Sequence, residues 1–137
     1  MSTLLLVDDN HDTCTVMSIM PTRAGHRCLC AANAAEAEEK LADATPDVIV
    51  SDLMMPYESG IDLCTKVRAD ARLKDVPFII FSAVSEQRYI DAAMDAGATD
   101  YWLKGSLTAR DLDRRLRPYL PGGVGWADDL AAGRAHL

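Results

Sequence analysis

The chain has 137 residues, of which 49% are hydrophobic and 26% charged, and its formal net charge is −7 at pH 7. This is an ordinary globular composition, and one domain of this length can bury a core without disulfide or metal staples. The acidic balance argues against direct nucleic-acid binding or an anionic membrane surface, because both require clustered Lys and Arg. No apolar run approaches the roughly 20 residues of a membrane helix. The chain begins without a basic segment before its first apolar run, so we expect a cytoplasmic protein.

Short apolar runs alternate with helical patterns along the first 120 residues. The runs cover residues 4–7, 28–32, 48–50, 78–81 and 99–103. Each run is short and mostly unalternated, which is typical of strands buried on both faces of a parallel sheet. Five such β–α repeats predict a three-layer α/β domain with right-handed crossovers.

Apolar residues at helical spacing predict the buried face of each intervening helix. In chain order the sets are Val16, Met20 and Ala24; Ala34, Ala37 and Leu41; Ile61, Cys64 and Val67 or Arg68; Ile90, Ala93 and Met94; Leu107, Leu112, Leu116 and Tyr119. Gly25 and Gly97 stand where helices should end, and Pro46 and Pro77 precede strands. Pro21 should kink or end the first helix, because it removes the backbone bond to Met17.

The four cysteines show no paired metal-ligand or redox motif in their spacing. They are Cys14, Cys28, Cys30 and Cys64. A zinc site or a disulfide stays open as an alternative that the spacing supports only weakly. We therefore expect small buried hydrophobes, with Cys28 and Cys30 on one face of a strand.

Polar residues follow four of the five predicted strands. Asp8 and Asp9 follow the first, Asp52 the third, Ser82 the fourth and Lys104 the fifth. Ligands of a doubly wound sheet bind beyond the carboxyl ends of its strands, so these side chains should gather at one edge. Three carboxylates stay ionised together only beside a cation, and such hard oxygen ligands suit Mg²⁺ or Mn²⁺. The ammonium and hydroxyl groups suit an incoming phosphoryl group, with a carboxylate as its nucleophile.

Each of these residues also has an ordinary interpretation when it is taken alone. Asp9 or Asn10 could cap a helix, and Asp52 could form a turn before Pro56. Lys104 could be a solvated charge and Tyr101 half-buried packing. Only their combination at one sheet edge favours the phosphoacceptor interpretation.

Four motifs occur in the order and spacing of a known family. They are Leu6-Val7-Asp8-Asp9-Asn10; Asp52-Leu53-Met54-Met55-Pro56 with Gly60 and Leu63; Phe81-Ser82-Ala83; and Ala96-Gly97-Ala98 with Lys104. With these motifs, residues 3–120 resemble the receiver domain of bacterial two-component response regulators, in the manner of a single-domain chemotaxis regulator. The resemblance implies a flavodoxin-like (βα)5 fold with a parallel sheet in the order 2-1-3-4-5. It places a receiver domain at residues 1–121 and leaves residues 122–137 as a flexible C-terminal tail or linker.

The resemblance also implies a role for each matching residue. Asp52 would accept a phosphoryl group from a histidine kinase or phosphotransfer protein, and the domain would catalyse only its own phosphorylation and dephosphorylation. The remaining roles are metal binding by Asp8, Asp9, Asp52 and the backbone carbonyl of Met54; phosphoryl contact by Lys104, Ser82 and the Ala83 amide; and switching by Tyr101. The surface of the fourth helix, fifth strand and fifth helix would then change for a downstream protein target. The domain would be a monomer or a phosphorylation-dependent dimer.

Two other classes of protein compete with a signalling switch. A scaffold or interaction module without phosphorylation would have no need of the complete polar set. A haloacid-dehalogenase-type phosphatase requires an acidic residue two positions after its nucleophile, where this chain has Met54. The arginines of the last helix could suggest nucleic acid, but Asp111 and Asp113 offset them and favour a docking or solvated surface.

One departure from the family pattern, at Gly105, and one pair of apolar residues lead to further expectations. Gly105 replaces the proline that commonly follows the lysine, so the Lys104–Gly105 peptide should be trans, since a non-proline cis bond costs about 3 kcal/mol. The resemblance to the family also implies that Met54 and Val84 flank the path of a water attacking the phosphorylated Asp52. Both are apolar, which predicts a long-lived phosphorylated state.

Overall fold

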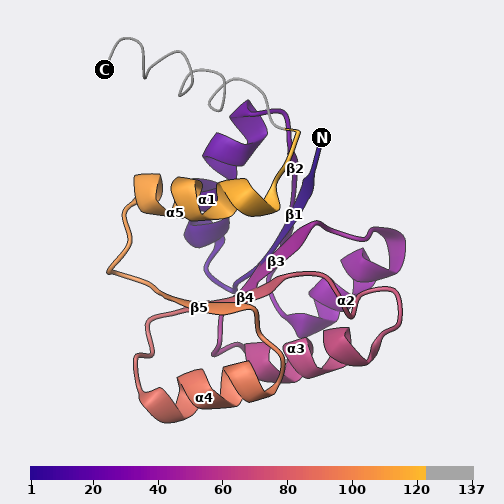
Figure 1. The fold of residues 1–137 in the computed structure, drawn as a ribbon, viewed down its shortest axis with the longest axis vertical. Coiled ribbons are helices and arrows are strands. Elements are labelled where there is room, and N and C mark those ends of the chain that lie inside the picture. The colour runs from indigo at the N-terminus through magenta and orange to yellow at the C-terminus, as the bar shows by residue number, and fades with distance from the viewer. Residues whose placement is uncertain (123–137) are drawn as a thin grey trace.

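Five parallel strands form one sheet in the order β2-β1-β3-β4-β5, as expected (Figure 1). In the computed structural model, which describes residues 1–122, the strands are β1 (Thr3–Val7), β2 (Arg27–Ala31), β3 (Val48–Ser51), β4 (Phe78–Ser82) and β5 (Asp100–Leu103). The helices are α1 (His11–Arg23), α2 (Ala34–Asp43), α3 (Gly60–Ala69), α4 (Gln87–Asp95) and α5 (Ala109–Leu116), followed by a 3-10 turn η1 (Arg117–Tyr119). The predicted flavodoxin-like fold is confirmed.

The helices cover the two faces of the sheet in unequal numbers. One face packs against α2, α3 and α4, and the other against α1 and α5 (Figure 1). Side chains along each strand point alternately to the two faces. In β1, Leu5 and Val7 pack in the first core, beneath α2, α3 and α4, and Leu4 and Leu6 pack in the second core, beneath α1 and α5. The three central strands β1, β3 and β4 are thus buried on both sides, which explains why their sequences are continuously apolar, whereas the edge strands β2 and β5 are only partly buried.

Polar caps fix where the helices begin, just after the carboxyl ends of the strands. The side chain of Asn10 accepts a hydrogen bond from the Asp12 amide, and Asn33 does the same for Glu36. Ser59 and Thr108 each form a capping box with the aspartate three residues on. Such caps satisfy backbone donors that a helix leaves free in its first turn.

The predicted buried faces hold for the middle of the chain and fail in three places. Ala34, Ala37 and Leu41 of α2 are all buried, as expected. In α1 the buried residues are Cys14, Met17 and Pro21, and Ala24 at the helix end is buried as expected, whereas Val16 is 50% exposed. Met94 of α4 is 44% exposed, and Leu107 and Tyr119 lie outside α5. These segments carry apolar residues on two faces, so periodicity alone could not select the one that packs.

Pro21 does not end α1 at its own position. The helix continues to Arg23, and Pro21 is buried in its last turn. The proline stands so close to the end that it removes only a terminal backbone bond, and its ring packs inward. Gly25 and Gly97 follow α1 and α4 with φ of 91° and 102°, as the helix-stop prediction requires.

The expectation of four unpaired cysteines is wrong for two of them. Cys14 of α1 and Cys30 of β2 form a disulfide with their Cα atoms 6.3 Å apart. The two residues face each other only after α1 packs on the sheet, so their spacing in the sequence did not reveal the pair. Cys28 and Cys64 are free, and Cys28 packs with Cys30 on the same face, as expected.

No helix within residues 1–122 has the length and hydropathy to cross a bilayer. The tail predicted for residues 122–137 falls outside the described residues, apart from Gly122.

Candidate functional site

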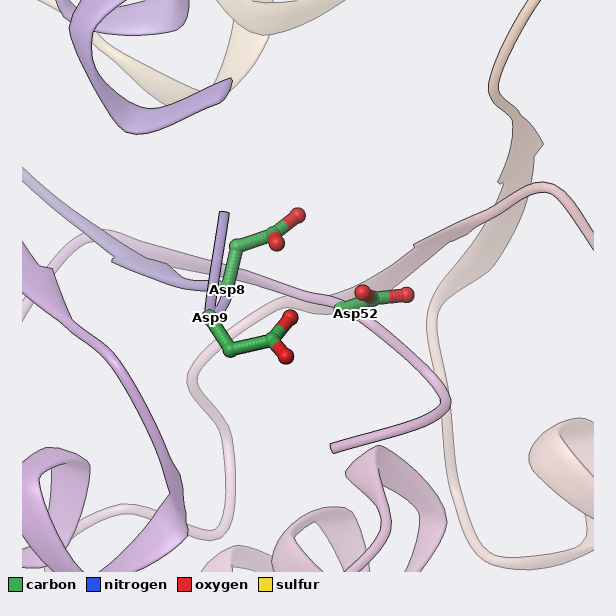
Figure 2. Close-up of side chains that lie close together, drawn as sticks. All are labelled: Asp8, Asp9 and Asp52. Carbon is green, nitrogen blue, oxygen red and sulfur yellow. The ribbon is translucent and has the colours of Figure 1, made fainter. Parts of the chain in front are cut away.

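Three carboxylates converge where β1 and β3 end. Asp8 and Asp9 follow β1 directly, and Asp52 follows β3, its neighbour in the sheet. Figure 2 shows the three side chains reaching toward a common space, and their ligand oxygens lie within 4.8 Å of one another. Asp8 is buried, Asp52 is half-buried and Asp9 is exposed, so the cluster opens to solvent on the Asp9 side.

Lys104 joins this cluster from the end of β5. Its Nζ lies 2.6 Å from Asp8 Oδ2 and 3.3 Å from Asp52 Oδ2. Burial lowers the pKa of Lys104, but the hydrogen bond to Asp8 and the charges of Asp52 and Asp8 outweigh it, so the pKa is raised. The ammonium group is therefore charged throughout the physiological range.

Asp52 is held by its neighbours in a defined orientation. Its Oδ1 accepts a hydrogen bond of 2.8 Å from the Leu53 amide, which leaves Oδ2 toward Lys104. Burial raises the pKa of Asp52, Lys104 lowers it, and the charge of Asp8 raises it again; the pKa lies above its usual value. The ionised form is thus destabilised until positive charge is supplied.

The backbone of the Asp8–Asn10 turn is tied to the sheet on one side and to α1 on the other. The Asp8 amide donates a hydrogen bond of 2.9 Å to the carbonyl of Ala31 at the end of β2. Asp8 Oδ1 accepts 2.9 Å from the Asn10 amide, and Asn10 in turn caps α1. Asn10, rather than Asp9, therefore has the capping role, and Asp9 keeps its carboxylate free for the cluster.

Ser82 and Tyr101 are linked through the loop after β4. Ser82 Oγ is buried and accepts 3.1 Å from the Val84 amide, while the Tyr101 hydroxyl donates 2.6 Å to the Val84 carbonyl. Burial is the main cause of a raised pKa at Tyr101. Ala83, between Ser82 and Val84, is exposed. The loop that would meet an incoming group is thus tied to β5.

Gly105, Met54 and Val84 carry the remaining expectations from the sequence. Residues 1–122 contain no cis peptide bond, so the trans prediction for Lys104–Gly105 is confirmed, and Gly105 has φ of 84°. Met54 is 51% exposed and Val84 is half-buried.

One feature of the site was not predicted at all. Cys14 lines a small internal cavity together with Asp8, Asp52 and Phe81, directly behind the carboxylates. No signal in the sequence could have placed a cysteine there, because the contact depends on how α1 packs against the sheet.

Comparison with known proteins identifies the family. The family model of the response regulator receiver domain matches residues 4–117. The chain belongs to the response regulator receiver domain family. A transcriptional regulatory protein, AfsQ1 of Streptomyces coelicolor, is 32% identical over 96% of this receiver and 57% of its own length. Chemotaxis protein CheY1 of Helicobacter pylori strain 26695 is 35% identical over 74% of this receiver and 83% of its own length.

A solved receiver has the same fold. The receiver domain of the sensor histidine kinase PA1611 from Pseudomonas aeruginosa, which holds a magnesium ion in its active-site cleft, matches with a TM-score of 0.76 and 27% identity over 86% of this receiver and 96% of that chain. This receiver spans about half the length of transcriptional regulators that it matches, between 48% and 57% for three of them. Family membership decides against the dehalogenase-type phosphatase and identifies a signalling-switch family.

Proposed function

We propose that this receiver accepts a phosphoryl group on Asp52 from a phosphohistidine of a histidine kinase or phosphotransfer protein. The observation that carries the proposal is the position of the Lys104 ammonium between Asp8 and Asp52, beside three converging carboxylates. Burial of Asp52 disfavours its ionised form and raises its pKa, although Lys104 opposes this. A carboxylate with one oxygen fixed by the Leu53 amide and the other directed toward Lys104 is suited to act as a nucleophile.

The carboxylates also fit a divalent cation, Mg²⁺ or Mn²⁺. Their oxygens lie within 4.8 Å of one another, and hard carboxylate ligands are those that these ions prefer. Asp8, Asp9 and Asp52 would hold the ion with the backbone carbonyl of Met54. When bound, the ion supplies positive charge that offsets the carboxylates and the phosphoryl oxygens. Lys104 would hold a phosphoryl oxygen, and the amide of Ala83, an exposed residue, would donate to another.

Transmission to a partner follows from the loop that joins Ser82 to Tyr101. A phosphoryl group on Asp52 would draw Ser82 Oγ from the Val84 amide, and the same loop carries the acceptor of the Tyr101 hydroxyl. Tyr101 lies on β5, between α4 and α5, so its displacement would alter the α4–β5–α5 surface. We propose that this surface binds a downstream protein rather than nucleic acid, in the cytoplasm, by a monomer or a phosphorylation-dependent dimer.

The test is phosphorylation by acetyl phosphate with Mg²⁺, followed by intact mass spectrometry. The wild-type protein should gain one phosphoryl group, Asp52→Asn none, and Asp9→Asn should require far more Mg²⁺. Asp43→Asn, an exposed change at the end of α2, is the matched control and should label like wild type. Stoichiometric labelling of Asp52→Asn would refute the assignment. An unlabelled wild type would favour an interaction module that is not phosphorylated.

A further inference from the structure

The Cys14–Cys30 pair connects the two elements that flank the Asp8–Asn10 turn. Cys14 is the fourth residue of α1, which begins directly after that turn. Cys30 pairs in register with Leu6 of β1, and the next residue, Ala31, accepts the Asp8 amide. Together with the pairing of Cys30 and Leu6 in the sheet, a bond between the two sulfurs therefore closes a ring through the segment that carries two of the three carboxylates.

The same pair lies close to the site on its inner side. Cys14 lines the small cavity behind Asp8 and Asp52 and is itself 6% exposed. The Cα separation of 6.3 Å falls within the range that a disulfide spans without backbone movement. Oxidation can thus proceed in the native fold, and its effect is transmitted directly to the turn.

We propose that Cys14 and Cys30 form a reversible oxidation site that sets how firmly the Asp8–Asn10 turn is held. With the bond formed, the start of α1 is fixed to β2, and the two aspartates keep their positions. With the bond broken, α1 is attached to the edge strand β2 only by packing and by the Cys28 contacts with Ser18 and Thr22 near the far end of the helix. The turn then gains freedom that cation binding must remove. The part of the proposal that concerns the cation rests on the proposed function.

The chemistry is a thiol–disulfide exchange with a dithiol reductant. One thiolate of the dithiol attacks Cys30 Sγ, because Cys30 is half-buried whereas Cys14 is buried. The Cys14–Cys30 bond breaks, and Cys14 leaves as a thiolate that takes up a proton. The second thiol of the dithiol then attacks the mixed disulfide, releases Cys30 as a thiol and ends as the oxidised dithiol. A small-molecule disulfide reverses the sequence and takes the two electrons.

The remaining cysteines supply a control within the same protein. Cys28 lies two residues before Cys30 on the same strand face, and its Sγ donates to the Ser18 carbonyl and accepts from Thr22 Oγ1. Burial raises the pKa of the Cys28 thiol, so it is a weak nucleophile toward the bond. Cys28→Ala should leave the redox response unchanged.

The experiment compares the full chain oxidised by a small-molecule disulfide with the chain reduced by a dithiol. Peptide mapping after alkylation counts the Cys14 and Cys30 thiols, and amide hydrogen exchange is followed over residues 8–20. We expect exchange in the first turn of α1 to be about fivefold faster in the reduced protein, at the lower end of the coupling usual between linked sites. Mg²⁺ alone, titrated by calorimetry, should bind about fivefold more weakly to the reduced form.

The Cys14→Ala, Cys30→Ala double variant should behave like reduced wild type under both conditions. Equal exchange in fully oxidised and fully reduced wild type would overturn the proposal, as would failure of the two thiols to pair. If neither form binds Mg²⁺ while the exchange difference persists, the proposed function fails and the oxidation site stands. If Mg²⁺ binds equally to both forms and exchange is equal, only the oxidation site fails.

Discussion

Lys104 forms two ion pairs of unequal length, one with Asp8 and one with Asp52. This difference gives the two carboxylates different environments. Lys104 is 0.7 Å closer to Asp8 than to Asp52, from distances of 2.6 and 3.3 Å. Lys104 therefore pairs chiefly with Asp8 in the resting protein, whereas Asp52 remains a partly desolvated charge. A charge of this kind lowers stability at neutral pH, since desolvation of an ion is only partly repaid by a distant partner.

The first prediction concerns the pH dependence of stability without divalent cations. The pKa of Asp52 is raised in the folded protein, so the charge of Asp52 destabilises the fold only where the carboxyl is ionised. This destabilisation is absent below the ordinary carboxyl pKa near 4. It grows as the pH rises from there through the raised pKa and is complete above the raised pKa. Asp52→Asn should therefore increase the free energy of unfolding at pH 7 by about 1 kcal/mol, at the low end of the gain from removing buried charges. The gain should vanish toward pH 4. Urea denaturation in EDTA measures both.

Asp8→Asn is the contrasting variant for this measurement. It removes the nearer partner of Lys104 and leaves a half-buried ammonium with Asp52 alone, so it should lower the free energy of unfolding at pH 7. Equal effects of the two substitutions would show that the unequal distances to Lys104 have no energetic consequence.

The second prediction concerns the lifetime of the phosphorylated state. Met54 and Val84 cannot hydrogen-bond an attacking water, and both can shield the phosphorus. Because orientation contributes much of the catalysis in phosphoryl transfer, phosphate loss should be about ten- to a hundredfold slower than in a Met54→Asn, Val84→Glu double variant. The measurement is loss of label after the donor is removed. Similar rates in the two proteins would mean that the metal shell and backbone position the water.

At the scale of elements, α3 is tied to the end of β3 by a contact that only glycine permits. The Gly60 amide donates 2.8 Å to the Leu53 carbonyl, and a Cβ at Gly60 would lie 2.1 Å from the carbonyl oxygen of Asp52. The start of α3 thus fixes the backbone of the phosphoacceptor candidate.

The third prediction follows from this contact. Gly60→Ala should force β3 and α3 apart and lower the free energy of unfolding by about 2 kcal/mol, in the usual range for overpacking. Gly105→Ala is the control, because no atom lies within 4 Å of its Cβ and only its φ of 84° opposes the change. It should cost about 1 kcal/mol. Thermal denaturation measures the loss of stability in each variant. A loss for Gly60→Ala as small as that for Gly105→Ala would contradict the close contact.

Features that depend on neighbouring residues in the sequence could be predicted, whereas features that depend on tertiary packing could not. The strands and the polar residues after them were predictable, because a fully buried strand must be apolar and a parallel sheet brings its carboxyl ends to one edge. The buried face of α1 was not, because Val16 and Met17 are both apolar and only packing against β2 selects Met17. The preference of Lys104 for Asp8 and the Cys14–Cys30 pair depend on side-chain distances that no local pattern records.

At the scale of the whole molecule, residues 4–120 form both cores. Leu120 is 2% exposed and packs in the core of α1 and α5, and Pro121 accepts a hydrogen bond from the Ser2 hydroxyl through its carbonyl. The two ends of the described chain therefore meet at the edge of the sheet opposite the carboxylates. A domain boundary just after residue 121 stays a prediction of the sequence, because residues 123–137 lie outside the described part of the chain.

The last prediction tests that boundary. If the boundary is correct, a protein that ends at Gly122 should keep its free energy of unfolding within about 0.5 kcal/mol of the full chain, the usual range for changes outside a folded core. It should also keep its labelling by acetyl phosphate. Leu120→Ala in the full chain is the matched comparison and should cost about 2–4 kcal/mol, because it leaves a cavity in the second core. Both are read from urea denaturation. If removal of residues 123–137 costs as much as Leu120→Ala, the tail is part of the folded domain and the boundary lies further along the chain.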